Sequence, residues 1–227
     1  MDEIDSTQSQ DFRFRTPSSF LLAGASKSGK TTFTLNLLRN IEALFSNPEC
    51  RHNVVYFYKE DQEAFDMFKE ENIVRLWINR LPTSENIDQL TAGYERSGSV
   101  VVIDDFDLKV NGDIADIFRT KCHHKNCVVI LLTQNIFCQK QFFREISLNC
   151  TYLVMFKNPR DASQINCLAK QVAPGAVAAL VATFKKATRR PHSYLLFDTD
   201  QSTPEWQRVK SRVLPHELPM ILHIRDK

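Results

Sequence analysis

The sequence lacks the features that mark secreted and membrane-spanning proteins. Its first residues, Met1 to Asp5, are acidic and polar, unlike a secretion signal. Apolar runs such as 176–182 are far too short to span a bilayer. The six cysteines are scattered, without the spacing of a disulfide scaffold. We therefore expect an intracellular protein with reduced thiols and no membrane segment.

The sequence also carries little net charge and no internal repeat. Its 29 basic and 27 acidic residues leave a net charge of +2, which argues against a strong overall attraction to DNA. Basic residues do gather at 185–190 and 208–212, and such stretches are either solvated faces or local contacts to DNA phosphates. No sequence-specific DNA-binding module is recognisable. The length of 227 residues is enough for one domain with a full core.

The strongest positive signal lies between Ser18 and Asn36. Residues 24–31 read Gly-Ala-Ser-Lys-Ser-Gly-Lys-Thr and match the Walker A pattern G-x-x-x-x-G-K-[ST] at every fixed position. A short, mainly apolar run precedes this loop, and apolar residues at helical spacing follow it. Backbone N–H groups of such a loop, together with the N-terminus of the next helix, can surround a phosphate. The stretch therefore predicts a site for a nucleoside triphosphate.

Each residue of the loop has an expected place in that site. Lys30 is expected to reach the β- and γ-phosphates, and the Thr31 hydroxyl to ligate Mg²⁺. Thr32 is expected to support the first helical turn, whereas Lys27 faces either solvent or a phosphate. The predicted nucleotide-binding residues are Gly24, Ala25, Ser26, Lys27, Ser28, Gly29, Lys30, Thr31 and Thr32.

A second signal is the run Val-Val-Val-Ile-Asp-Asp at 100–105, which reads as a Walker B strand. An apolar strand that ends in carboxylates presents them at the edge of a parallel sheet where the phosphate loop also opens. Asp104 is expected to hold Mg²⁺, directly or through water, and Asp105 to orient and deprotonate the attacking water. The next apolar strand, 127–132, is followed by Thr133 and Gln134. Gln134 is expected beside the Walker B strand, where it can contact the γ-phosphate or the water.

Apolar strands and helical patterns alternate along the chain. Strands are expected at 19–22, 53–58, 73–81, 100–103, 127–132, 152–156 and 193–197, the last closing the sheet. Helices are expected from the phosphate loop to residue 45 and at 61–70, 83–96, around 114–118, 161–171 and 175–187. This alternation predicts an α/β P-loop NTPase with a mainly parallel central sheet flanked by helices, of the additional-strand, RecA-like class. Residues 1–15 are expected to form a flexible polar tail, 16–200 the ATPase domain, and 201–227 a proline-containing C-terminal extension.

Several segments between residues 18 and 200 carry a family resemblance. Besides the two Walker segments, they are Cys-His-His-Lys-Asn at 122–126, Leu-Thr-Gln-Asn-Ile-Phe at 132–137, Ile-Ser-Leu-Asn at 146–149 after Arg144, and Phe-Lys-Asn-Pro-Arg-Asp at 156–161. With these segments the sequence resembles the viral genome-packaging ATPases of the HerA/FtsK superfamily, especially those of Maverick/Polinton elements and adinto-like viruses. The segments after the Walker motifs are the selective ones, because Walker motifs alone occur in many families.

The resemblance implies a homo-oligomeric ring, a hexamer, that hydrolyses ATP with Mg²⁺ and drives double-stranded DNA into a preformed viral capsid at its portal vertex. It also implies a host nucleus or cytoplasmic virus-assembly site, or association with the virion. Such rings complete each site with an arginine from the neighbouring subunit. Related translocases carry it near the start of the strand after the glutamine, where this sequence has Thr151 and Tyr152. Arg144 and Arg160 are therefore both candidates. Asp105 also departs from the glutamate of many members and is one methylene shorter.

Three other readings are compatible with a Walker A motif. A small-molecule kinase of the nucleoside type needs a mobile, arginine-bearing lid, and the region after Gln134 shows no clear lid. A GTPase usually carries Asn-Lys-x-Asp, which the segment Lys157 to Arg160 does not match. A capsid scaffold could bind nucleotide without turnover. Assays of ATP turnover and of nucleoside phosphorylation would separate these readings.

Overall fold

A single mixed sheet runs through the protein. The structure, a computed structural model, describes residues 13–106, 110–136 and 140–224. Within these residues nine strands pair in the order β3-β2-β4-β5-β1-β6-β7-β8-β9. They are β1 Ser18–Ala23, β2 Val54–Tyr58, β3 Leu76–Ile78, β4 Ser99–Asp104, β5 Cys127–Thr133, β6 Tyr152–Phe156, β7 Tyr194–Asp198, β8 Val209–Ser211 and β9 Met220–Ile221.

All pairs among β1 to β6 are parallel, whereas the pairs β6–β7, β7–β8 and β8–β9 are antiparallel. Strand β5 lies between β1, which leads into the phosphate loop, and β4, which ends in Asp104. This insertion is the additional strand that the sequence predicted, and the mainly parallel sheet is confirmed. The prediction that the strand at 193–197 closes the sheet is wrong, since β8 and β9 continue it. The prolines at 204, 215 and 219 lie outside these two strands and leave their backbone pairing intact.

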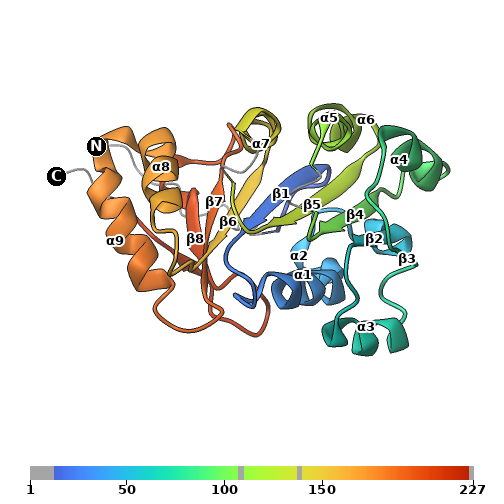
Figure 1. Ribbon diagram of the computed structural model, residues 1–227, viewed down its shortest axis with the longest axis horizontal. Helices are drawn as coiled ribbons and strands as arrows, with labels where there is room; N and C mark the ends of the chain where they lie inside the picture. Colours follow the sequence, from blue (N-terminus) through green and yellow to red (C-terminus); the bar gives the residue numbers. More distant parts are fainter. Residues whose placement is uncertain (1–12, 107–109, 137–139, 225–227) are drawn as a thin grey trace, which may run out of the picture.

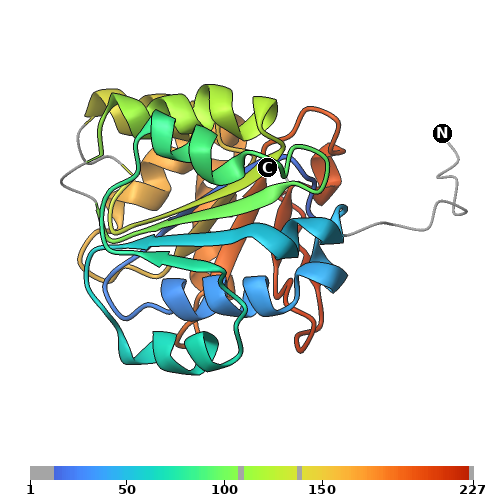
Figure 2. The same ribbon diagram turned by 90° about the vertical axis from the view of Figure 1, so that its right-hand side faces the viewer.

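Helices cover both faces of the sheet (Figures 1 and 2). One face packs against α1 Lys30–Arg39, α2 Ile41–Leu44 and α3 Asp66–Glu70. The other face packs against α4 Ser84–Thr91, α5 Gly112–Asp116, α6 Cys122–His124, α7 Lys140–Leu148, α8 Ser163–Val172 and α9 Val177–Ala187. A π-helical turn at Ile117–Lys121 joins α5 to α6. The result is a three-layer α/β arrangement.

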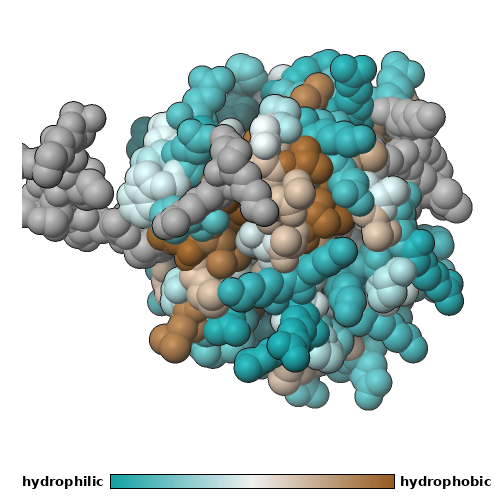
Figure 3. All heavy atoms as spheres, turned by 90° about the vertical axis from the view of Figure 1, so that its left-hand side faces the viewer, coloured by the Kyte–Doolittle hydropathy of each residue, from teal (hydrophilic) through white to brown (hydrophobic). Residues whose placement is uncertain are grey.

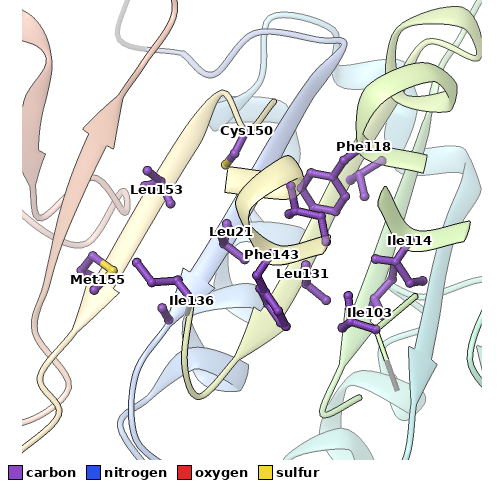
Figure 4. Close-up of a cluster of buried hydrophobic side chains, with 14 of the residues drawn as sticks. Leu21, Ile103, Ile114, Phe118, Leu131, Ile136, Phe143, Cys150, Leu153 and Met155 are labelled. Carbon is purple, nitrogen blue, oxygen red and sulfur yellow. The ribbon is translucent and has the colours of Figure 1, made fainter. Parts of the chain in front are cut away.

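The strand sequences explain these two apolar layers. Successive side chains of a strand point to opposite faces, so Leu21 and Ala23 of β1 enter one core while Phe20 and Leu22 enter the other. All four side chains are completely buried. Figure 4 shows the first core, in which Phe143 of α7 lies with the sheet residues Leu21 and Leu131. Burial on both faces is the reason why the strands read as continuous apolar runs.

The main differences from the sequence predictions lie in four elements. The helix expected at 83–96 ends at Thr91. The helix expected to continue to residue 45 ends at Arg39, and α2 begins after Asn40. The strand expected at 73–81 shrinks to β3, which pairs only with β2 at the edge of the sheet and is only half-buried. Helix α7 lies where no element was expected; its buried apolar side chains, Phe143 and Ile146, are three residues apart and face the sheet.

The N-terminal end of the described chain packs on the sheet. Phe14 is buried, with its ring centroid 5.0 Å from those of Phe20 and Tyr152, and Arg15 forms an ion pair with Asp200 at 2.9 Å. Residues 1–12 of the expected polar tail lie outside the described residues. Figure 3 shows apolar side chains gathered on the side of the molecule with α8 and α9. None of the described helices has the length and apolarity needed to cross a membrane.

Candidate active site

The phosphate loop connects β1 to α1, and two of its positions require glycine. A Cβ on Gly24 would lie 2.6 Å from the Cβ of Phe156 and 2.8 Å from the Oγ of Ser28. Gly29 has φ +104°, a conformation that favours glycine, and a Cβ there would lie 3.1 Å from the Cβ of His192. These close approaches explain why small residues dominate the loop.

Lys30 begins α1 and folds its side chain back over the loop. Its Nζ donates hydrogen bonds to the carbonyl oxygens of Gly24, at 2.7 Å, and Ala25, at 3.0 Å. The Ser28 Oγ is buried and has no hydrogen-bond partner in the described part of the chain. Ser26 and Lys27 are exposed, and Lys27 has φ +61°. The ammonium group thus lies inside the curve of the loop, where phosphate oxygens can take the place of the carbonyls.

Thr31 connects the loop to the Walker B strand. Its Oγ1 donates a hydrogen bond to Oδ2 of Asp104 at 3.4 Å. Thr32, the next residue, is exposed on the first turn of α1. Thr31 and Asp104 are 73 residues apart in the chain but lie together at the carboxyl edge of the sheet. A hydroxyl and a carboxylate are the hard oxygen ligands that Mg²⁺ prefers, so this pair fits the ion.

Asp104 is the last residue of β4 and is only 4% exposed. Its Oδ2 also accepts hydrogen bonds from the Tyr56 hydroxyl, at 2.9 Å, and from Nε2 of Gln62, at 3.4 Å. Burial raises the pKa of this carboxyl to about 6; the Tyr56 bond and the charge of Lys30 partly offset that rise. The three hydrogen bonds all end on Oδ2. The carboxylate is therefore held in one orientation.

Asp105 and Gln134 follow the ends of neighbouring strands. Asp105 has φ +64°, a conformation that aspartate tolerates better than most residues, and its charge adds to the raised pKa of Asp104. The β4–β5 register pairs Asp104 with Leu132, two residues before Gln134. The Gln134 side chain is exposed, and its backbone oxygen accepts a hydrogen bond from Gln164 at 3.4 Å. Gln134 thus follows the strand beside the Walker B strand, as expected, and its role stays a prediction.

The two candidate arginines lie on different elements. Arg144 is exposed on α7, and Arg160 is exposed in the turn after β6. Both side chains are thus accessible from solvent. The choice between them stays open.

The structure adds three residues to the site that the sequence did not single out. They are Tyr56 and Gln62 beside Asp104, and His192 beside Gly29. For Tyr56 a signal was present: in the parallel register it pairs with Val102, so it shares a face with Asp104. That signal can be used only when β2 and β4 are known to be neighbours. Part of the basic stretch at 185–190 also lies here, since Arg189 and Arg190 line a hollow with residues 25–28 of the loop.

The raised pKa of Asp104 predicts a pH-dependent effect on stability. The folded state binds a proton on the Asp104 carboxyl more tightly than the unfolded chain does. Above pH 6, where this carboxyl is ionised in the folded state, its raised pKa therefore lowers the free energy of unfolding. Protonation removes the cost as the pH falls from about 6 towards the ordinary value of 3.8. Asp104→Asn should therefore raise the free energy of unfolding at pH 7.5 by up to about 3 kcal/mol.

Thermal unfolding of the nucleotide-free protein, followed by circular dichroism from pH 7.5 to 4.5, measures this effect. We expect the variant to unfold several degrees higher at pH 7.5 and the difference to shrink towards pH 4.5. Asp66→Asn, at an exposed position on α3, is the matched control. A difference that does not change with pH would contradict the explanation.

Comparisons of the sequence with known proteins found no matching family model and no matching curated protein. Solved structures do match the fold. The genome packaging NTPase B204 of Sulfolobus turreted icosahedral virus 2, in complex with ATP-gammaS, superposes with a TM-score of 0.57 at 16% identity. The match covers 86% of this chain and 96% of that one. B204 of Sulfolobus turreted icosahedral virus, a DNA-packaging ATPase, gives a TM-score of 0.55 at 14% identity over the same shares.

A bacterial protein shares the fold as well. The cytoplasmic domain of the type VII secretion ATPase EccC of Thermomonospora curvata matches with a TM-score of 0.53 at 15% identity, over 82% of this chain and 24% of that one. At these identities the likeness establishes the fold, which is that of P-loop NTPases. Viral packaging ATPases, the class that the sequence resembles, are thus among the proteins with this fold.

Proposed function

We propose that this chain is a Mg²⁺-dependent ATPase that assembles into a ring and packages double-stranded DNA into a viral capsid. The observation that carries the proposal is the contact between Thr31 of the phosphate loop and Asp104 of the Walker B strand, 3.4 Å apart across the inserted strand β5. The contact unites the two halves of a nucleotide site. B204 structures in complex with ATP-gammaS and AMPPCP, at 16% and 17% identity, lend support through the shared fold.

Binding of ATP relies on the loop and on Lys30. The backbone N–H groups of residues 25–31 surround the phosphates, and the Lys30 ammonium moves from the carbonyls of Gly24 and Ala25 to phosphate oxygens. The Thr31 hydroxyl and the Asp104 carboxylate would hold the metal ion. When bound, Mg²⁺ would neutralise the negative charge that develops on the β- and γ-phosphate oxygens.

Hydrolysis then depends on the residues after the strand ends. Asp105 accepts a proton from a water molecule, whose oxygen attacks the γ-phosphorus while the bond to the β-phosphate oxygen breaks. ADP and phosphate are the products. Gln134 orients the water or the γ-phosphate, and an arginine of the neighbouring subunit, Arg144 or Arg160, stabilises the transferring group.

The packaging role takes its support from the sequence resemblance and from the fold. Lys185 and Lys186 of the basic stretch, both exposed, would suit contact with DNA phosphates, because such contacts need no base recognition. A ring at the portal vertex of a capsid, in the host nucleus or a cytoplasmic assembly site, would couple ATP turnover to DNA entry. The Maverick/Polinton type of the enzyme and the hexameric state belong to the same proposal.

The proposal is tested by phosphate release with and without double-stranded DNA, alongside mass measurement of the assembled state. We expect DNA to stimulate turnover several-fold and the 26.2-kDa chains to form a closed ring. Stimulation should decline with rising salt, since the DNA contacts are electrostatic. Assembled rings that release no phosphate with DNA would indicate a nucleotide-binding scaffold instead, and a phosphorylated nucleoside would indicate a kinase.

A further inference from the structure

Two hollows lie on either side of the turn between α9 and β7. The first, about 330 Å³, opens onto residues 25–28 of the phosphate loop. The second, about 490 Å³, opens onto Gly29 and onto Thr32 and Asn36 of α1. Residues 190–193 of the turn line both hollows. This turn is therefore a wall that the nucleotide site shares with the C-terminal half of the chain.

The turn is held close to the end of the phosphate loop. His192 has φ +61°, and its side chain lies so near Gly29 that a Cβ there would be 3.1 Å from the His192 Cβ and 3.2 Å from its Nδ1. Strand β7, which begins at Tyr194, fixes the far end of the turn. The Tyr194 hydroxyl donates a hydrogen bond to Glu217 at 2.6 Å and accepts one from the backbone of Val213 at 2.8 Å. These contacts join the turn, the start of β7 and residues 213–217 into one packed unit.

The order of the strands gives a bound nucleotide a direction. From β1, the strands β5 and β4 lie on one side, and Thr31 reaches Asp104 on that side. Strands β6 and β7 lie on the other side of β1. With its terminal phosphates at Lys30 and Asp104, a triphosphate can extend its nucleoside towards β6 and β7, away from the β4 side. Thr32, the residue after Thr31 in the first turn of α1, lines the second hollow.

We propose that the base and ribose of the nucleotide occupy the second hollow, between α1 and the α9–β7 turn. This inference rests on the proposed function. His192 and Arg190 are the residues that contact the nucleoside: imidazole and guanidinium groups present flat faces on which an aromatic base can stack. Asn36, on the opposite wall, offers an amide with both donors and an acceptor. A hollow of about 490 Å³ lies within the usual size range of small-molecule sites.

The test compares ATP with inorganic tripolyphosphate, which has the phosphates but neither base nor ribose. Affinities of both ligands for the full chain are measured by calorimetry with Mg²⁺ present. The variants are His192→Asn, which keeps a residue that tolerates positive φ, and Arg190→Gln. The matched control is His52→Asn, an exposed histidine before β2, at the opposite edge of the sheet. Loss of one stacking contact should weaken ATP binding about three- to tenfold.

The expected pattern is selective. Both site variants should bind ATP more weakly and tripolyphosphate as the wild type does, and His52→Asn should change neither affinity. Equal weakening of both ligands, or no weakening of either, would overturn the subsite. A wild type that binds ATP no more tightly than tripolyphosphate would also overturn it while leaving the phosphate loop in place. If the wild type binds neither ligand, the proposed function is refuted, and the subsite proposal with it.

Discussion

Asp105→Asn is expected to keep ATP binding and to lose turnover by about 10²- to 10⁴-fold, the usual contribution of a general base. The amide cannot accept the proton of the attacking water at neutral pH, but its size and its tolerance of positive φ are those of aspartate. Asp105 has φ +64°, so asparagine should leave the backbone after β4 unchanged. Steady-state phosphate release with DNA measures turnover, and calorimetry with a non-hydrolysable ATP analogue measures binding.

The matched control for this variant is Asp66→Asn, which removes an exposed carboxylate from α3, outside the proposed site. Equal turnover of the wild type and Asp105→Asn would refute the proposed role of Asp105. A parallel loss of binding and turnover would also refute it, because the carboxylate would then hold the nucleotide rather than activate water. The selective loss is the signature of a residue that acts only in the transition state.

Lys30→Ala is expected to weaken ATP binding by about 100-fold, since two charge-assisted hydrogen bonds to phosphate oxygens contribute about 3 kcal/mol together. In the nucleotide-free protein the same ammonium bonds the carbonyls of Gly24 and Ala25, so the lysine already lies within the loop. Calorimetric titration with ATP and Mg²⁺ gives the affinity, and near-ultraviolet circular dichroism checks that the variant is folded.

Lys27→Ala is the matched control, because it removes the other lysine of the same loop. Lys27 is exposed, whereas Lys30 lies inside the curve of the loop. The control should bind ATP within a few-fold of the wild type. Equal losses in the two variants would mean that the net charge of the loop, and not the position of Lys30, determines affinity.

Local patterns were enough to predict the central part of the fold. The Walker A residues lie in one continuous stretch, so strand, loop and helix could be read from neighbouring positions, and the structure places them as β1, residues 24–29 and α1. The strand that ends in Asp104 was evident for the same reason, because an apolar run on a sheet buried on both faces is unbroken. The position of β5 beside β4 also agrees with the prediction.

Contacts between distant segments could not be predicted in this way. The bond from Tyr56 to Asp104 requires β2 and β4 to be neighbours in a given register. The contact of His192 with Gly29 joins residues that lie far apart in the chain, and it depends on β7 turning antiparallel after α9. Helix α7 was not predicted, although its sequence carries a local signal: Phe143 and Ile146 are three residues apart, the spacing of one helix face, and both are buried. The Tyr56 and His192 contacts depend on packing between distant segments, which local patterns do not contain.

The central claim is that the phosphate loop and the end of the Walker B strand hold one magnesium-bound triphosphate between them. A crystal structure of the chain with Mg²⁺ and ATP-gammaS tests this claim most directly. It should show a single metal ion that contacts the Thr31 hydroxyl and the β- and γ-phosphates, with Asp104 bonded to the ion or to one of its waters. A nucleotide bound away from residues 24–32, or a metal ion out of reach of both Thr31 and Asp104, would contradict it.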